Sequence, residues 1–583
     1  MNLVGGLFLP GTTLKSLRAC ALSALLLVGL ASCGDDRAFS AFGGTREGTT
    51  PVEANPENAA AAARFLTQAT FGPTDNDIKT IMATGYDVWL EGEFNAVSSS
   101  HRAYIDNRLA QMQLTNPSAS LSANQFYESY WLYASTSRAQ LRERMKLALS
   151  EIFVISLLDS AIDVRGAASY YDMLGTNAFG NYRTLLEQVS LHPMMGRYLT
   201  HLANQKEDTT SGRTPDENFA REVLQLMSIG TYQMNNDGTP RRDGTGATIP
   251  TYTAEDVSNL AKVFTGYSWY SPTPTNTTFA GGSRNVDASV RPMIFYANYH
   301  SITAKTFLGT TIPAGAASAN DLTIALDTIF NHANVPPFMC HRIIQRLVTS
   351  NPTPAYLGRC SAVFINNGSG VRGDLQAVIR AILLDPEARS ASLAATPTFG
   401  KVREPMIRLT NWMRAYGATS ISGNYLITST SANTSLGLSA LSSPSVFNFF
   451  RPGYVPPNTR LGAQGLTAPE FQIVDEVTVA GYANTMQTAI GTGIGSGSDV
   501  RSAYVNEVAI AEDANTLVDR MDRMLLYGQM TPTLRARLIE SVNSIVIPAP
   551  TANNAATIAT AKLNRARLAV YMTMVSPEYL VQR

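Results

Sequence analysis

Hydrophobic residues recur with the period of an α-helix along most of the chain from residue 59 onward. In the segment 374–384 the apolar residues fall at i, i+3, i+4, i+7 and i+8, and Asp374 stands where a helix N-cap is expected. A second segment, 254–264, carries its apolar residues on one face, with Thr253 as the cap and Gly266 placed to end it. Strand-like alternation is rare. The pattern predicts an all-α fold, a large multi-helix domain with long polar loops and at most short β pieces.

The same period predicts the remaining elements. Further helices are expected at 59–69, 74–84, 138–158, 182–203, 320–332, 336–349, 354–366, 401–416, 469–488, 513–527, 531–545 and 556–575. Polar loops rich in Gly, Ser, Thr, Asn and Pro are expected at about 231–252, 268–300, 417–443 and 489–502. Because these loops interrupt helices and do not separate domains, we expect one helical domain over residues 59–583.

The first 32 residues have a pattern that is typical of export. Lys15 and Arg18 precede an apolar run at 19–30, which is shorter than the roughly twenty residues that span a bilayer and is typical of a signal peptide. The run ends in Leu30-Ala31-Ser32-Cys33, which resembles the bacterial lipobox. We therefore expect cleavage before Cys33 and lipid attachment to its thiol. The alternative is an ordinary signal peptide with a chance cysteine.

Residues 33–58 are expected to form a flexible tether between the lipid and the domain. They are rich in Gly, Asp, Thr, Pro and Ala and contain little that could pack. Gly34 follows the cysteine where inner-membrane lipoproteins carry Asp, so resemblance to lipoprotein sorting signals favours the outer membrane. The expected location is the cell envelope, at the outer membrane, with the periplasmic and surface faces both open.

Composition narrows the class of partner. The chain has 45 basic and 45 acidic residues and no basic stripe, which argues against a nucleic-acid partner. Cys340 and Cys360 are the cysteines that remain once Cys20 has left with the signal peptide and Cys33 is acylated. An oxidising compartment makes a disulfide between them plausible, and two core cysteines that never meet are the alternative.

Familiar catalytic motifs are absent from the sequence. Gly368 to Gly373 matches GxGxxG, but the residues before it read as a helix and not as the strand that a dinucleotide site needs, so a turn between two helices is predicted. There is no HExxH, no GxSxG and no GxxxxGK[ST]. The histidines are scattered, and a lone histidine is more often structural than catalytic. These observations leave the metal and the cofactor, if the protein uses either, unidentified.

One polar patch stands out within the segment 214–226. Thr214, Pro215 and Glu217 predict the start of a helix, with Thr214 and Glu217 as a capping box. At about 100° per residue, five polar side chains then fall within roughly 140° of one another on that helix. They are Glu217, Asn218, Arg221, Glu222 and Gln225.

This patch has two interpretations. It is a solvated face with an i, i+4 ion pair between Glu217 and Arg221, or it is a site. Two carboxylates beside an arginine are what general acid–base chemistry or a hard cation would use. Its lack of lysine favours a fixed hydrogen-bonding network over a merely soluble surface.

The sequence resembles the bacterial domain of unknown function 1800 family. The resemblance covers about residues 60–583 and departs at Tyr267, where many members have Trp. It rests on Glu217-Asn218-Phe219-Ala220-Arg221-Glu222 with Leu226 and Gly230, on Arg64-Phe65-Leu66 with Ala69-Thr70-Phe71-Gly72-Pro73, on His192-Pro193 with Tyr198-Leu199, on Tyr252-Thr253 with Asp256-Val257 and Phe264-Thr265-Gly266-Tyr267, on His300 with Lys305-Thr306-Phe307-Leu308-Gly309, and on Val371-Arg372-Gly373-Asp374-Leu375.

The resemblance implies an exported bacterial protein without an assigned reaction, often encoded beside a secreted sulfatase-like protein that is a candidate partner. Two functions follow as expectations. The first is an extracytoplasmic hydrolase of a polymeric or sulfated substrate, and the second is a surface-tethered binding or assembly lipoprotein without catalytic activity. The candidate catalytic residues are Glu217, Arg221, Glu222, His192 and His300, and the candidate binding residues are Asn218, Gln225, Asp256 and Lys305.

Overall fold

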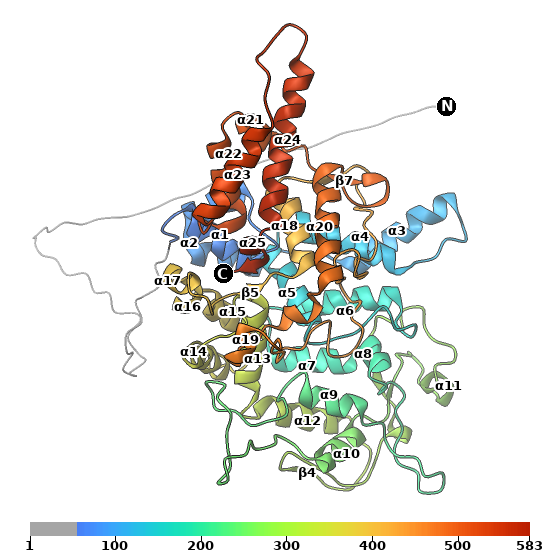
Figure 1. Cartoon of the computed structure of the whole chain (residues 1–583). Helices are drawn as coiled ribbons and strands as arrows, with labels where there is room; N and C mark the ends of the chain where they lie inside the picture. Colours follow the sequence, from blue (N-terminus) through green and yellow to red (C-terminus); the bar gives the residue numbers. More distant parts are fainter. Residues whose placement is uncertain (1–54) are drawn as a thin grey trace, which may run out of the picture. The chain divides into compact units, whose positions relative to one another are not determined.

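Helices dominate the regular structure of the chain, as the sequence predicts (Figure 1). The computed structural model describes residues 55–583, which belong to one compact unit. The predicted signal peptide, Cys33 and the tether as far as residue 54 lie outside the described residues.

The first half of the described chain runs from α1 to α12. Its helices are α1 (Ala59–Ala69), α2 (Asp75–Asn95), α3 (His101–Thr115), α4 (Ala123–Thr136), α5 (Gln140–Ser150), α6 (Val164–Asn177), α7 (Tyr182–Leu191), α8 (Pro193–Tyr198), α9 (Asn218–Gln225), α10 (Ala254–Val263), α11 (Asn276–Phe279), the 3-10 turn η1 (Ala297–Tyr299) and α12 (Asn320–Asn331).

The second half runs from α13 to the C-terminus. Its helices are α13 (Val335–Leu347), α14 (Pro354–Ile365), α15 (Leu375–Leu383), α16 (Pro386–Arg389), α17 (Ala391–Ala394), α18 (Pro405–Ala415), α19 (Arg460–Ala463), η2 (Pro469–Ile473), α20 (Glu476–Gly491), η3 (Ser496–Ser498), α21 (Val505–Ile510), α22 (Ala514–Met521), η4 (Asp522–Leu526), α23 (Pro532–Ser544), α24 (Ala555–Met574) and α25 (Pro577–Leu580).

Strands are short and pair two by two. All four pairs are antiparallel: β1 (Tyr267–Ser268) with β2 (Ile294–Phe295), β3 (Lys305–Phe307) with β4 (Thr310–Ile312), β5 (Lys401–Val402) with β8 (Val581–Gln582), and β6 (Thr419–Ser420) with β7 (Val500–Arg501). The glycine-rich segment 368–373 lies in the turn between α14 and α15, as the sequence predicts.

Caps confirm several predicted helix starts. Asp374 accepts a hydrogen bond from the backbone N–H of Ala377, and Thr253 forms a capping box with Asp256. These side chains satisfy N–H groups that the first turn of a helix leaves without a partner.

Two predicted helices are longer than the observed ones, and in each case a proline stands at the first position of an observed helix. The predicted helix 182–203 divides into α7 and α8 because Pro193 begins a new helix at its first position. The predicted helix 401–416 begins only at Pro405, since Lys401 and Val402 pair with the C-terminal strand β8. This pair and the β3–β4 pair lie outside the predicted polar loops, so the short β pieces are not confined to those loops.

Other boundaries also differ from the prediction. The helix predicted over 138–158 ends at Ser150, and the segment 469–488 begins as the turn η2 before α20. The prediction omits α3, α4 and α6. Helix α3 buries only His101 and Ile105, and α4 buries residues 125–131 without a break, so the helical periodicity of both is weak. Helix α6 buries an apolar face that the prediction missed.

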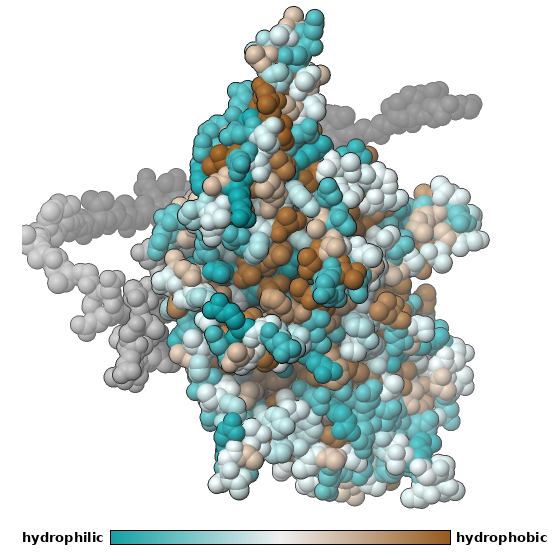
Figure 2. Space-filling view, viewed as in Figure 1, coloured by the Kyte–Doolittle hydropathy of each residue, from teal (hydrophilic) through white to brown (hydrophobic). Residues whose placement is uncertain are grey.

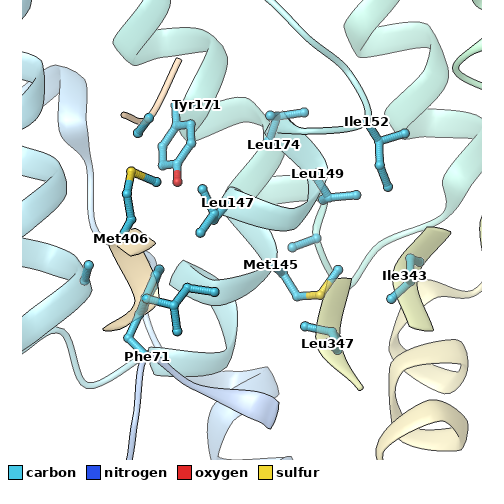
Figure 3. Packing of buried hydrophobic residues seen from close by; sticks show 14 of the residues in the cluster. Phe71, Met145, Leu147, Leu149, Ile152, Tyr171, Leu174, Ile343, Leu347 and Met406 are labelled. Carbon is cyan, nitrogen blue, oxygen red and sulfur yellow. The ribbon is translucent and has the colours of Figure 1, made fainter. Parts of the chain in front are cut away.

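The hydrophobic core is centred on α5, which packs against α6 and α2 (Figure 1). Figure 3 shows Met145, Leu147 and Leu149 of this helix among side chains from distant segments, with Met406 and Leu347 nearby. Helix α5 thereby joins the N-terminal helices to the C-terminal half of the unit.

Hydrophilic residues cover most of the lower part of the face in Figure 2, where Figure 1 places α9, α10 and α12. Hydrophobic surface gathers higher up, near α18 and α20. No helix within residues 55–583 combines the length and the hydropathy needed to cross a membrane.

Candidate functional site

Helix α9 carries the predicted polar patch, but it begins later than predicted. Its first residue is Asn218, and no side-chain cap is formed by Glu217, so the predicted start and capping box at Thr214 are wrong. The cause is Asn204, whose amide accepts from the N–H of Asp216 at 2.9 Å and donates to its carbonyl at 3.1 Å. These two hydrogen bonds hold the residues before Asn218 outside the helix.

The outer half of the patch is a solvated surface. Arg221 Nη2 lies 3.0 Å from Glu217 Oε2, and the two side chains are 44% and 41% exposed. Asn218 lies beside them, exposed, with its backbone N–H donating to Asp216. An exposed i, i+4 pair of this kind contributes little to stability and leaves its charges available to a partner.

The inner half of the patch is buried. Glu222 is 7% exposed, and its Oε2 has no hydrogen-bond partner among the described residues. Burial raises the pKa of Glu222 above its ordinary value, and Arg221 opposes this only in part. Gln225 accepts a hydrogen bond from the hydroxyl of Tyr252 at 3.0 Å. Adjacent residues of one helix face therefore have opposite environments.

His192 has a local structural role. Its Nδ1 accepts from the backbone N–H of Met194 and caps α8, and its ring packs edge-on against Tyr170. Burial lowers the pKa of His192 to about 3, so the ring is neutral at physiological pH. Its Nε2 has no partner within residues 55–583.

His300 belongs to a buried network with Asp321 and Lys305. His300 Nε2 lies 3.0 Å and Lys305 Nζ 2.8 Å from Asp321 Oδ2, and His300 Nδ1 lies 2.8 Å from the carbonyl of Thr265. All three side chains are at most 8% exposed. The network fixes β3 and the start of α12 against the loop after α10.

The predicted site residues do not converge. Within residues 55–583, no hydrogen bond or ion pair joins Glu217, Arg221 or Glu222 to His192 or His300. Asp256 caps α10 and accepts from the backbone N–H of Leu308, which makes it a structural residue of that helix.

Cys340 of α13 and Cys360 of α14 form a disulfide, with their Cα atoms 5.9 Å apart. Both side chains are buried between the two helices. The bond links neighbouring antiparallel elements across their connecting turn.

A cluster of buried charges, which the sequence did not indicate, lies at the centre of the unit. Arg346 Nη1 lies 3.0 Å from Glu151 Oε2, and Lys401 Nζ lies 3.0 Å from both Glu404 Oε1 and Glu470 Oε1. Each of these side chains is at most 5% exposed. We call these five residues, with Arg144, the central charge cluster.

Arg144 completes the cluster through the backbone. Its Nη2 donates to the carbonyl of Arg346 at 2.6 Å, and Lys401 donates to the same carbonyl at 3.0 Å. The cluster thus contains three acidic and three basic side chains, and its opposite charges offset the cost of removing them from water.

The pKa values of two carboxyl groups in the central charge cluster shift in opposite directions. Burial raises the pKa of Glu151, and Arg346 opposes the rise only in part. Burial acts on Glu404 in the same sense, but Lys401 and Arg144 outweigh it and lower the pKa of Glu404. The environment therefore favours the protonated form of Glu151 and the ionised form of Glu404.

No pattern in the sequence could have predicted this cluster. Its members come from α5, α13, the segment before α18 and η2, so no single helix face carries them. The one local signal is Lys401 to Glu404 immediately before Pro405, which places charges on extended backbone at a helix start.

A serine, a histidine and an acid also meet in the core. Ser129 Oγ lies 2.8 Å from Nδ1 of His101, whose Nε2 lies 3.6 Å from Glu143 Oε2. These three residues are at most 2% exposed, and Ser129 donates to the carbonyl of Phe126 in its own helix. Solvent does not reach the hydroxyl, so this arrangement locks α3, α4 and α5 together.

Among the residues that the structure describes, no group of three or more His, Cys, Asp or Glu side chains is arranged to hold a metal ion.

A family model described as "Protein of unknown function (DUF1800)" matches residues 64–581. Comparison with curated proteins and with solved structures gave no match.

Proposed function

We propose, from the premise that the chain belongs to the DUF1800 family of proteins of unknown function, that it is an exported, lipid-anchored bacterial protein whose helical body binds a partner at the cell envelope. The lipobox-like Leu30 to Cys33 and the polar segment after it support the anchor. The disulfide between Cys340 and Cys360 supports an oxidising compartment, where such bonds persist.

The observation that carries the binding function is the exposure of the outer half of the α9 patch. Glu217, Asn218 and Arg221 present two charges and an amide on the surface, and no hydrogen bond or ion pair within residues 55–583 joins them to a histidine. Planar hydrogen-bonding groups that are fixed by a helix suit recognition of another protein better than they suit proton transfer. The secreted sulfatase-like protein that the resemblance implies is the partner we propose.

A hydrolase of a polymeric or sulfated substrate is the second candidate. Glu222 favours it, because a buried carboxyl with a raised pKa and an oxygen without a partner is what a general acid requires. Its neighbour Arg221 would then hold an anionic group of the substrate.

The anchor is tested in cells that are fed labelled palmitate. Wild-type protein is expected to take up the label, and Cys33→Ser is expected to lose it while the chain stays unprocessed or becomes soluble. Undiminished labelling of Cys33→Ser would refute lipid attachment at this residue.

The two functions are separated with purified proteins. Calorimetry with the sulfatase-like protein should show binding that Arg221→Glu weakens at least tenfold, whereas Arg537→Glu, which reverses an exposed charge on α23, leaves it unchanged. Equal binding by both variants would refute the α9 surface as the interface. Hydrolysis of an aryl sulfate that Glu222→Gln abolishes without lowering the melting temperature would instead support the hydrolase.

A further inference from the structure

A small pocket lies beside Glu151, at the end of α5. Its floor is formed by Leu147, Ser150 and Glu151, with Met406 of α18 beside them, and its roof by the segment 438–449. Figure 3 shows Leu147 and Met406 within the surrounding apolar core. The pocket has a volume of about 10 Å³ for a water-sized occupant, which is about the space that one water molecule needs.

Two polar groups of the roof face this pocket without a partner. Asn448 Nδ2 and Ser443 Oγ form no hydrogen bond within residues 55–583, although the residues are only 7% and 3% exposed. The Tyr198 hydroxyl lies close enough to Ser443 for this contact to oppose the rise in the pKa of Tyr198, which burial raises to about 12, so Asn448 Nδ2 is the donor that lacks such a contact. A buried donor without a partner is costly, so a native protein that keeps one beside a pocket indicates an occupant.

The backbone of the roof is held under strain at this place. Leu441 and Asn448 have φ of +50° and +63°, in the left-handed region that residues with a side chain rarely occupy. Such conformations persist where the surroundings impose them, and they concentrate at ligand clamps.

The roof is nevertheless firmly attached. Leu157 N–H donates to the carbonyl of Leu441 at 2.7 Å, Ser156 Oγ donates to the carbonyl of Ser443 at 2.7 Å, and Tyr127 Oη lies 2.6 Å from Ser442 Oγ. The unpartnered groups therefore do not result from a loose loop, because the backbone around them is fixed.

The lining selects a neutral occupant. Arg346, 3.0 Å from the carboxyl group of Glu151, would repel a cation, and the mostly apolar lining makes the burial of any charged occupant costly. A neutral hydroxyl oxygen can accept from Asn448 and both accept from and donate to Ser443 and Glu151, which gives it the two to four polar partners that a buried water requires.

We propose that this pocket is a binding site for one neutral hydroxyl oxygen, a water molecule or the hydroxyl group of a small alcohol, held between Glu151, Ser443 and Asn448. The apolar wall of Leu147, Met406 and Phe449 is what would accept the carbon of an alcohol. The occupant links α5 to a segment almost 300 residues later in the chain and gives the carboxyl group of Glu151 a hydrogen-bonded neighbour.

The test is a high-resolution crystal structure of the full chain, with and without methanol. One density peak within hydrogen-bond distance of Asn448 and Ser443 is expected. A peak that stays a single atom in methanol identifies water, and density that extends toward Phe449 identifies an alcohol site. The proposal is overturned if the wild-type pocket holds no peak, or if Asn448 is hydrogen-bonded to a protein group instead.

Two variants make the test sharper. Ser443→Ala removes one partner with little change in volume and is expected to lower the occupancy of the peak at least twofold. Ser445→Ala removes a hydroxyl from the exposed side of the same roof and is expected to leave it unchanged. Equal occupancy in wild type and Ser443→Ala would show that Ser443 does not hold the occupant and would overturn the site as proposed.

Discussion

At the scale of single residues, depth below the surface separates side chains that the sequence groups together. Glu217, Arg221 and Glu222 share one face of α9 by their angles, yet the first two are solvated and the third is 7% exposed. A helical wheel gives direction around an axis and no information on what covers each direction. Tyr252, which donates to Gln225, also lies near Glu222 on the inner side of the patch.

This difference predicts opposite results for two substitutions in the patch. Arg221→Ala should change the free energy of unfolding by less than about 1 kcal/mol, because an exposed ion pair is screened by water. Glu222→Gln should be neutral or stabilising, since the amide avoids the cost of burying a charge. Thermal melts of both variants, with Glu217→Ala as the matched control for Arg221→Ala, measure this. A large loss of stability in Arg221→Ala would mean that the pair is buried.

Glu151 should make stability depend on pH. Its pKa is raised from 4.5 to about 8 by burial in the folded protein, so the folded state holds an extra proton between these values. The contribution of Glu151 to the free energy of unfolding is then largest below about pH 4.5 and is lost as the pH rises toward 8. Glu151→Gln removes this proton, and its melting temperature should fall less than that of wild type between pH 5 and 8.

The expected size of this pH dependence follows from the pKa shift of Glu151. One unit of pKa shift corresponds to about 1.4 kcal/mol, so the difference between the two proteins should reach a few kcal/mol across the range. Glu93, whose pKa burial raises to about 7, titrates in both proteins and cancels in the difference. Glu404 has a lowered pKa and acts only at more acidic pH. Parallel curves for the two proteins would show that Glu151 is ionised throughout.

At the scale of elements, local chemistry predicted most helices but not all their boundaries. Helix α1 matches its predicted bounds, and α15 begins after the cap Asp374 as expected, because apolar period and cap agree there. The errors occur where tertiary contacts override the period: β5 is extended because β8 pairs with it, and α9 is shortened because Asn204 holds the residues before it. The partner of β5 is the C-terminal strand, and Asn204 lies 12 residues before Asp216, beyond the reach of a capping pattern, so neither contact is visible in the local sequence.

The candidate site was predictable only in part for the same reason. The surface half of the α9 patch follows from spacing within one helix. The central charge cluster is assembled from four segments that are separated by up to about 320 residues, and its members look like ordinary surface charges in the sequence. Only the fold reveals that they are buried and paired.

The disulfide between α13 and α14 predicts a defined loss of stability. It closes a loop with a sequence separation of 20 residues, which corresponds to about 3 kcal/mol if the chain entropy of the unfolded state dominates. Cys360→Ser should therefore lower the free energy of unfolding by about that amount, and the double variant with Cys340→Ser should match it. Denatured, unreduced protein without its signal peptide should show no reactive thiol at these positions. Two reactive thiols would contradict the bond.

At the scale of the whole unit, the central charge cluster joins parts of the chain that lie far apart in the sequence. Arg346 is contributed by α13, Glu151 by the end of α5, and Lys401 by the segment that also pairs with the C-terminal strand. Apolar packing tolerates small shifts between elements, whereas a buried ion pair requires one arrangement. We therefore expect the cluster to make residues 55–583 unfold as one cooperative unit.

Lys401 is the residue at which this expectation is most sharply tested. Its ammonium lies 3.0 Å from Glu404 and from Glu470 and is only 1% exposed, so Lys401→Met keeps the length of the side chain but leaves two buried carboxylates without their cation. Loss of one member of a buried ion pair costs about 3–5 kcal/mol.

Adding Glu470→Gln to Lys401→Met removes one of the stranded charges and should recover at least about 1 kcal/mol, which a double-mutant cycle in denaturant measures. Lys562→Met on α24, which breaks a pair with the exposed Glu512, should cost less than about 1 kcal/mol. If Lys401→Met cost no more than this control, the cluster would be a consequence of the fold and not one of the contacts that hold it together.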